Sequence, residues 1–317
     1  MNEPIPGTDL KAIADRRTAY KHSLAAGLLF AGVLLAIAFL PVSSKPTPIA
    51  IESPETVDSF KDISLTGEAA IVYDLAHRKV LYEKNAEAQV PLASLAKLLT
   101  VQTTFEALGG DAEVTIDIHA IRAEGDSGFK AGERFTVRDL AALALVGSSN
   151  DAAAALVSEA SARRGESETA LLASAAAALG LAQTYAVNGT GLDSSEHISG
   201  AYGSAHDVAL MAGAIARNLP DVARLTTDGA VAVTSLSGKK HSLPNTDPYA
   251  VTIPGLLLSK TGYTDLAGGN LALVFDAGVG HPIAVVVLAS TREGRFIDAL
   301  GLIQATQSLF TLSDYAH

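Results

Sequence analysis

The sequence predicts an α+β fold (an α/β sandwich) in which an all-helical subdomain is inserted into one antiparallel sheet. Two groups of strand patterns, near residues 69–83 and over about 231–290, flank a region of helical patterns at about 94–225. Elements that are grouped in this way, rather than alternating along the chain, are typical of an α+β fold. The strands from the two ends are therefore expected to meet in one sheet.

The N-terminal region contains a candidate membrane span. Residues 24–42 form a run of 19 residues without charge, which is long enough to cross a bilayer. Three cations precede it, Arg16, Arg17 and Lys21, so the positive-inside rule places residues 1–22 in the cytoplasm and the rest beyond the membrane. A cleaved signal peptide is the alternative, but the stretch before the run is long for one and no clear Ala-x-Ala site follows.

These features divide the chain into four parts. We expect a cytoplasmic segment at residues 1–22, a transmembrane signal anchor at 23–42, an extracytoplasmic linker at 43–62 and one globular domain at 63–312. The linker is rich in Pro, Ser, Thr and Glu, which is typical of an extended tether. The globular domain would then be held at the membrane by a single pass.

Within the domain, the elements can be assigned in order. Residues 69–75 and 80–83 read as a hairpin, because both are mostly apolar and the segment between them is a polar turn. The helical region begins at Ser94, which opens an apolar run that ends at a Gly-Gly pair. A tight loop at 147–150 separates two further helical patterns, of which the first spans 137–146.

Strands return after the helical region. Two strongly apolar stretches, residues 270–277 and 282–290, are expected to pair as adjacent antiparallel strands. Lys260 should lie on the strand before them, with its side chain pointing out of the hydrophobic layer. An amphipathic helix at 296–310 closes the domain.

The composition excludes several classes of function. The net charge is −11, the pI is about 5.1, and no basic stripe with interleaved aromatic residues occurs, so binding to nucleic acid is not supported. The chain has no cysteine, which removes disulfides, thiol catalysis and Cys-ligated zinc. No His-Glu-x-x-His pattern is present. We therefore expect a site without a metal or a cofactor.

Three short motifs stand in order along the domain: Ser94-Leu-Ala-Lys97, Ser148-Ser-Asn150 and Lys260-Thr-Gly262. They supply a nucleophile with an amine base, a hydroxyl with an amide, and a cation with a hydroxyl on a strand. Each also has a plain structural interpretation. Ser94 could cap the first helix, Asn150 or Asp151 could cap the helix after the loop, and Lys260 could be a solvated lysine at the end of a strand. A second Ser-x-x-Lys, Ser237-Gly-Lys-Lys240, lies in a polar stretch that reads as a hairpin tip, so this motif is weak on its own.

The serine chemistry can be argued from the residues. A serine hydroxyl is a poor nucleophile without an adjacent base, and no Gly-x-Ser-x-Gly elbow indicates a Ser-His-Asp arrangement. At the start of a helix, Ser94 and Lys97 are three residues apart and share a face. Lys97 is then the base for Ser94, provided that partial burial and the nearby Lys260 keep its amine neutral.

Over about residues 63–310, the sequence resembles the low-molecular-mass penicillin-binding proteins of the D-alanyl-D-alanine carboxypeptidase type. The resemblance extends beyond the three motifs, because Gly67 to Glu83 is similar to the opening hairpin of that family and Asn188-Gly-Thr-Gly-Leu-Asp193 to its Asn-x-x-Gly-Leu segment. It implies the serine transpeptidase/β-lactamase fold. It also implies that residues 63–312 are a serine DD-peptidase catalytic domain on the periplasmic or cell-wall side of a bacterial membrane.

The activity that this resemblance implies is a serine-type D-Ala-D-Ala carboxypeptidase. Such an enzyme removes the terminal D-alanine from peptidoglycan stem peptides through an acyl-enzyme, here on Ser94, and is acylated by β-lactam antibiotics. A DD-endopeptidase of peptidoglycan crosslinks is the first alternative, since fold and motifs do not fix the substrate. The remaining alternatives are a class A-like β-lactamase, for which no convincing deacylating glutamate is found, and a non-catalytic peptidoglycan- or β-lactam-binding protein.

The family also implies roles for the second motif. Ser148 would relay a proton toward the leaving amine. Asn150 would orient Lys97 and hold the amide of the substrate.

Further roles concern the binding of the peptide. Lys260 and Thr261, with Gly262, would receive its terminal carboxylate, and the backbone N–H groups of Ser94 and Tyr263 would form the oxyanion hole. Arg295 resembles, by its position after the last strand, a family arginine that helps to bind the carboxylate.

Overall fold

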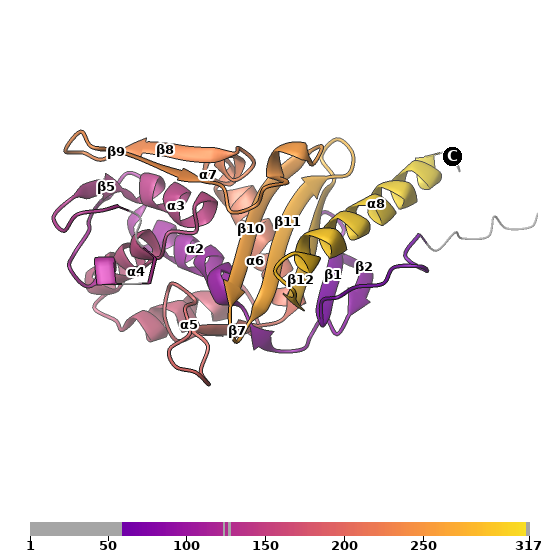
Figure 1. Ribbon diagram of the computed structural model, residues 1–317, viewed down its shortest axis with the longest axis horizontal. Coiled ribbons are helices and arrows are strands. Elements are labelled where there is room, and N and C mark those ends of the chain that lie inside the picture. The colour runs from indigo at the N-terminus through magenta and orange to yellow at the C-terminus, as the bar shows by residue number, and fades with distance from the viewer. Residues whose placement is uncertain (1–58, 123, 126–127, 315–317) are drawn as a thin grey trace, which may run out of the picture. The chain divides into compact units, whose positions relative to one another are not determined.

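The computed structural model describes residues 59–122, 124–125 and 128–314 (Figure 1). The chain divides into two units, Met1–Thr56 and Val57–His317, and all of the described residues belong to the second. The cytoplasmic segment, the signal anchor and most of the linker expected in the first 58 residues lie outside the described residues. No helix within the described part is long and apolar enough to cross a bilayer.

Five strands form the main sheet: β1 (Ala69–Asp74), β2 (Lys79–Lys84), β10 (Leu256–Thr264), β11 (Gly268–Asp276) and β12 (Pro282–Ser290). Their order is β10-β11-β12-β1-β2, and every neighbouring pair is antiparallel. β1 pairs with β12 along its whole length, with Ala70 opposite Val287. The prediction that the two ends of the domain share a sheet is confirmed (Figure 1).

Helices cover both faces of this sheet. α8 (Gly294–Asp314) packs on one face, where Val72 and Val285 point, and α6 (Ala205–Asn218) packs on the other. In Figure 1, α8 crosses in front of the sheet and α6 lies behind it. Successive side chains of a strand point to opposite faces. Because both faces are covered, residues 271–275 of β11 and nearly all of β12 are apolar instead of alternating.

Most helices lie between β2 and β10. Besides α6, they are α2 (Ala96–Leu108), α3 (Val137–Val146), α4 (Asn150–Arg164), α5 (Glu168–Ala178) and α7 (Pro220–Leu225), with the 3-10 turns η1 (Ala93–Leu95), η2 (Ala120–Arg122) and η3 (Ala250–Thr252). α2 is central, because it contacts α3, α4, α5 and α6. Its first nine residues are all buried, so even its polar side chains must find partners inside the protein.

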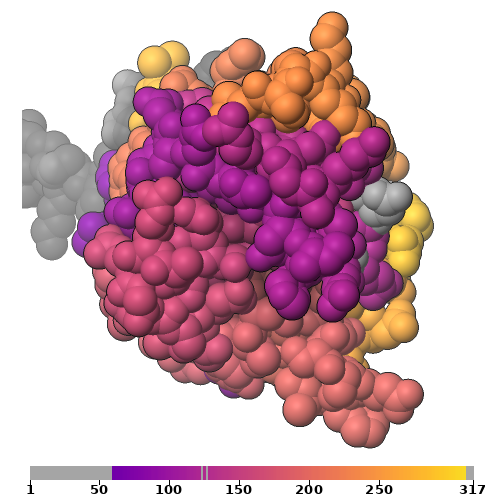
Figure 2. Space-filling view, turned by 90° about the vertical axis from the view of Figure 1, so that its left-hand side faces the viewer, coloured from indigo at the N-terminus to yellow at the C-terminus, as the bar shows by residue number. Residues whose placement is uncertain are grey.

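The expectation of an all-helical subdomain is wrong in one respect, because short strands tie its loops together. They are β4 (Glu113–Thr115), β5 (Arg134–Thr136), β6 (Tyr185–Ala186) and β7 (Ala201–Gly203). β7 also pairs with β3 (Val90–Pro91), which lies just before the subdomain. Strands of two or three residues are too short to leave an alternating pattern in the sequence. A longer hairpin, β8 (Ala230–Thr234) and β9 (Lys240–Pro244), packs on α3 and is seen in orange along the upper edge of Figure 2.

Candidate active site

Ser94 lies in η1, the turn that leads into α2, and Lys97 lies in the first turn of α2. The residues that precede η1 and α2 are Leu92 and Leu95, and neither element has a side-chain cap. The interpretation of Ser94 as an N-cap is therefore wrong. Ala93 has a φ of +48°, in the left-handed region, and strained backbone of this kind is concentrated at functional sites.

Lys97 is completely buried. Its Nζ lies 2.7 Å from each of three oxygens, Ser94 Oγ, Asn150 Oδ1 and the carbonyl oxygen of Thr190. Burial lowers the pKa of Lys97 to about 7, because the ammonium form loses its hydration. The neutral amine beside Ser94 Oγ is therefore far more accessible near neutral pH than that of an ordinary lysine. A neutral amine there can accept the proton of Ser94, as a general base must.

The second motif occupies the loop between α3 and α4. Ser149 caps α4, because its Oγ accepts a hydrogen bond from the N–H of Ala152 at 3.1 Å. The interpretation of Asn150 as the cap is therefore wrong, and its amide is left for the site. Asn150 accepts from Lys97 through Oδ1 and donates through Nδ2 to the carbonyl oxygen of Glu124, which fixes the orientation of the amide.

Lys260 lies on β10, as predicted, but it is buried, so the interpretation as a solvated lysine is wrong. Its Nζ donates to Ser148 Oγ at 2.9 Å and to the carbonyl oxygen of Thr261 at 2.7 Å. Burial, and after it the charges of Lys97 and Arg295, hold the pKa of Lys260 well below its usual value. The contact between Lys260 and Ser148 joins the second and third motifs.

The rest of the third motif forms the edge of β10 that faces the nucleophile. A Cβ on Gly262 would come within 2.9 Å of the carbonyl oxygen of Leu92 and 3.3 Å of the backbone nitrogen of Leu95. Glycine therefore allows this strand to lie directly against η1. Thr261 Oγ1 is 2.6 Å from Thr246 Oγ1, and Tyr263 comes next, partly exposed, near the end of the strand.

Arg295 lies near the start of α8 and is buried. Its Nη1 donates to the carbonyl oxygen of Gly262 at 2.6 Å and to that of Asn270 at 3.5 Å. Burial and then the charge of Arg292 lower the pKa of Arg295. Arg295 thus holds the backbone of β10 and β11 beside the third motif. Arg292 is the exposed guanidinium of the pair, and it lies 3.7 Å from the centre of the Tyr263 ring.

The loop after β6 completes the site, and the sequence predicted no role for its residues there. Thr190 contributes a backbone carbonyl oxygen, which accepts from Lys97 and leaves no side-chain signal in the sequence. Asn188 Oδ1 shapes the loop by accepting from the N–H groups of Thr190 and Gly191. Gly191 has a φ of +76°, and a Cβ on it would come within 1.9 Å of the carbonyl oxygen of Ala93.

Asn270 on β11 is a second residue that the sequence did not indicate. It is completely buried. Its Nδ2 donates to the carbonyl oxygen of Pro91 at 3.0 Å, and its Oδ1 accepts from the N–H of Ala289 at 2.8 Å. One amide therefore fixes the segment that leads to Ser94 against the centre of the sheet.

A cleft of about 500 Å³ begins one residue beyond Gly262. Its walls carry four carboxylates and one guanidinium, from Glu124, Asp193, Glu196, Asp265 and Arg292. Asp193 also accepts from Thr264 Oγ1 at 3.0 Å, which ties the loop after β6 to the end of β10. The cleft offers space for a chain that extends along β10.

Known proteins carry related sequences and structures. The chain matches the D-alanyl-D-alanine carboxypeptidase family (peptidase family S11) over residues 55–291. It is 30% identical to the D-alanyl-D-alanine carboxypeptidase DacF of Bacillus subtilis (strain 168) over 240 residues, which are 74% of this chain and 60% of that protein. It is also 30% identical to the D-alanyl-D-alanine endopeptidase of Escherichia coli (strain K12) over 82% of this chain and 83% of that protein.

Among solved structures, penicillin-binding protein D2 of Listeria monocytogenes in its ampicillin-bound form is similar, with a TM-score of 0.64 and 28% identity over 77% of this chain and 98% of that one. This structural similarity confirms the predicted fold, and the family match confirms the predicted family. The alignment spans about 60% of the length of the Bacillus protein, so the likeness describes the part that the two chains share. The chain belongs to the D-alanyl-D-alanine carboxypeptidase family of serine peptidases.

Proposed function

We propose that the chain is a serine-type D-alanyl-D-alanine carboxypeptidase, which removes the terminal D-alanine from peptidoglycan stem peptides. The observation that carries this proposal is the buried lysine Lys97, with its Nζ 2.7 Å from Ser94 Oγ and its pKa lowered to about 7. That pair supplies an activated nucleophile at neutral pH. The family supplies the reaction class.

The first half-reaction forms the acyl-enzyme. Lys97 takes the proton of Ser94 Oγ, and Oγ attacks the carbonyl carbon between the two D-alanines. The C–N bond then breaks, and Ser148 passes a proton from the lysine pair to the nitrogen of the departing D-alanine. Lys260 contacts Ser148 Oγ, so it can hold this hydroxyl in line for the transfer.

The second half-reaction releases the shortened peptide. Water attacks the ester carbonyl, Lys97 accepts its proton, and the bond to Ser94 Oγ breaks as the proton returns to that oxygen. The backbone N–H groups of Ser94 and Tyr263 bind the oxyanion in both halves, and one such donor is typically worth about 3 kcal/mol of the barrier. Thr261 and Lys260 receive the terminal carboxylate, and the rest of the stem peptide occupies the cleft beyond Gly262.

Arg295 enters the proposal in a different role from the one expected. Its Nη1 is bonded to the carbonyl oxygen of Gly262, so it positions the third motif and strengthens its positive field. Arg292, at the cleft, is the exposed cation in this region that can approach the substrate. We assign it to the binding of the peptide.

β-Lactam antibiotics are proposed as covalent inhibitors that acylate Ser94, as the ampicillin-bound Listeria relative suggests. We also propose that residues 23–42 anchor the chain in the cell membrane and that the catalytic domain works on the cell-wall side. The uncharged run and the cations before it support this arrangement.

DD-endopeptidase activity on peptidoglycan crosslinks is the second candidate. It is favoured by the relative of that name, which aligns over 83% of its own length. Both reactions cleave a bond between D-alanine and an amine, and they differ in the group that this amine carries. A carboxypeptidase site must hold a terminal carboxylate, whereas an endopeptidase site must leave room for a further chain.

One experiment tests the proposal. The full chain in detergent and its Ser94→Ala variant are incubated with penicillin, and their masses are measured by mass spectrometry. The release of D-alanine from a pentapeptide is then measured for both proteins. We expect an adduct on Ser94 and free D-alanine, both lost in the variant. Rapid penicillin hydrolysis without an adduct would indicate a β-lactamase, and the absence of both products would leave a binding protein. Cleavage of a crosslinked dimer but not of the pentapeptide would indicate the endopeptidase.

A further inference from the structure

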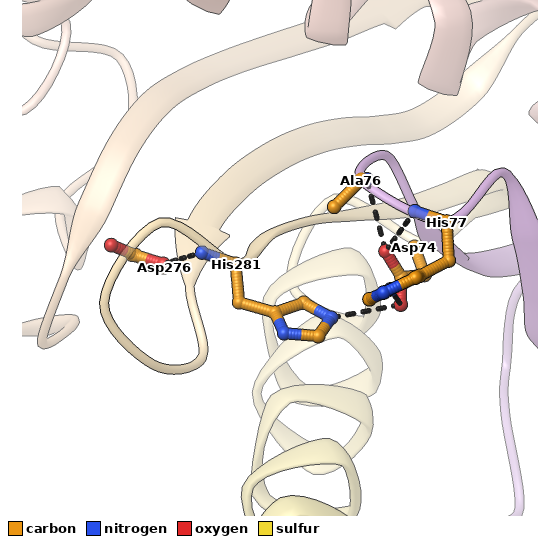
Figure 3. A network of polar contacts seen from close by, with 5 residues as sticks. All are labelled: Asp74, Ala76, His77, Asp276 and His281. Carbon is orange, nitrogen blue, oxygen red and sulfur yellow. Dashed lines mark hydrogen bonds and ion pairs between the residues drawn. The ribbon is translucent and has the colours of Figure 1, made fainter.

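Three potential metal ligands meet far from the three motifs, where two hairpins end side by side (Figure 3). Asp74 is the last residue of β1, His77 lies in the turn after it, and His281 lies in the turn between β11 and β12. The active site is near the other end of β11, where Gly269 pairs with Tyr263. Seven residues of strand separate Gly269 from the end of β11, which corresponds to about 23 Å.

The carboxylate of Asp74 is fixed before any ligand arrives. It is buried, and its Oδ1 accepts hydrogen bonds from the N–H groups of Ala76 and His77, both at 2.9 Å. Its Oδ2 faces the two imidazoles, at 2.9 Å from His77 Nδ1 and 2.9 Å from His281 Nε2. Figure 3 shows both rings directed at this oxygen.

His281 is held as well. The backbone N–H of His281 donates to Asp276 Oδ1 at 2.6 Å, and its ring packs edge-on against Phe310, with centroids 4.7 Å apart. The rings of His77 and His281 lie 4.9 Å apart. Support of this kind around ligand side chains reduces the cost of ordering them when a metal binds.

We infer that Asp74, His77 and His281 form a binding site for a divalent cation of the zinc type. Each side chain offers one ligand atom, and the three atoms lie within 4.8 Å of one another. Ligands about 2.1 Å from a tetrahedral zinc lie about 3.4 Å apart, so Asp74 Oδ2 and each nitrogen must separate by about 0.5 Å. Two imidazoles and one carboxylate favour zinc over magnesium or calcium, which prefer oxygen ligands.

Binding changes the position of two protons. His77 Nδ1 and His281 Nε2 must present lone pairs to the cation, so each neutral ring carries its hydrogen on its other nitrogen instead of donating to Asp74. The side chain of His77 is 66% exposed, which leaves water free to supply the fourth ligand. The cation would link the first hairpin of the sheet to the last and stabilise the folded chain.

The test is a zinc titration of the full chain in detergent, without an affinity tag and after treatment with a chelator. Calorimetry with ZnCl₂ and the shift in thermal unfolding temperature are measured for the wild type, His77→Ala and the control His119→Ala. His119 is an exposed histidine on another loop. We expect the wild type to bind zinc and to unfold at a higher temperature when zinc is present. In His77→Ala the affinity for zinc should fall about tenfold or more and the thermal shift should shrink, whereas His119→Ala should behave like the wild type. MgCl₂ should produce neither effect.

The exposure of His77 means that its replacement leaves the fold intact, and Asp74→Asn provides a second variant that keeps an oxygen for the two backbone N–H groups. Zinc binding that is equal in the wild type and in both of these variants would overturn the inference. So would a chain that neither binds zinc nor gains thermal stability from it. The cluster would then be a hydrogen-bonded corner of the sheet alone.

Discussion

The chain contains the pattern Ser-x-x-Lys three times. Ser127 of one copy lies outside the described residues, and the other two copies differ in everything except their letters. Ser94 and Lys97 lie at the start of the central helix, where Lys97 is buried and bonded to three oxygens. Ser237 and Lys240 lie at the tip of the β8–β9 hairpin, where both are exposed, and Ser237 Oγ contacts Ser235 Oγ. The two copies therefore differ in the burial of the amine and in its partners, which the spacing alone does not supply.

The largest expected effect separates the two serines. Replacement of Ser94 by alanine should lower D-alanine release by a factor on the order of 10⁴ or more, because the proposed nucleophile is lost. Ser237→Ala should retain full activity and should still form a penicillin adduct. Loss of the adduct in Ser237→Ala with its retention in Ser94→Ala would reverse the assignment of the two copies.

The two lysines give the next effect. Lys97→Ala removes the proposed general base, a contribution typically of about 10²- to 10⁴-fold, so acylation by penicillin should slow by about that factor. Lys240→Ala removes an exposed side chain and should leave the acylation rate unchanged. Stopped-flow measurement of acylation checks both, and equal rates for Lys97→Ala and the wild type would exclude Lys97 as the base.

Two glycines with positive φ, Gly191 and Gly238, allow the same two regions to be compared through their backbone. Gly191→Ala would bring a Cβ within 1.9 Å of the carbonyl oxygen of Ala93, whereas a Cβ on Gly238, at the hairpin tip, meets nothing within 4 Å. Gly238→Ala should cost about 1–2 kcal/mol of unfolding free energy from the left-handed backbone alone. Gly191→Ala should cost more and should also lose acylation, because the turn before Ser94 must move. Chemical denaturation and the penicillin adduct measure the two effects, and equal losses would show that the contact is relieved elsewhere.

The smallest effect concerns pH. Lys97 must be neutral to accept a proton, and burial lowers its pKa to about 7. Acylation by a penicillin should therefore be independent of pH well above 7 and should fall about tenfold for each unit below it. A profile that stays flat down to about pH 5 would mean that Lys97 keeps its neutral form by another route or that it is not the base.

The sequence indicated those parts of the site that are carried by side chains in short motifs. Ser94, Lys97 and Lys260 could be assigned because a helix start and a strand were recognisable around them. Thr190 could not be, since it acts through a carbonyl oxygen that every residue possesses. The role of Arg295 also depended on distance, because only the fold reveals that its Nη1 reaches the backbone of Gly262 rather than open solvent.

The fold was predictable where its elements are long. The opening hairpin and the apolar strands β11 and β12 left clear patterns, whereas β6 and β7 are too short to do so. The sequence suggested Asn150 or Asp151 as the cap of α4, whereas the cap is Ser149, and serine and asparagine are equally good caps. The hydrogen bond from the N–H of Ala152 to Ser149 Oγ decides between them.

The pairing of β1 with β12 sets the order of events during synthesis. Ala70 and Val287 lie opposite each other although they are 217 positions apart in the chain. The centre of the sheet cannot close until the ribosome has passed residue 287, and contacts over such separations form slowly. Until then β1 lacks one of its neighbours, and an apolar strand without a partner is prone to aggregate. A nascent chain therefore lacks the sheet that supports Ser94 until almost the whole domain has been made.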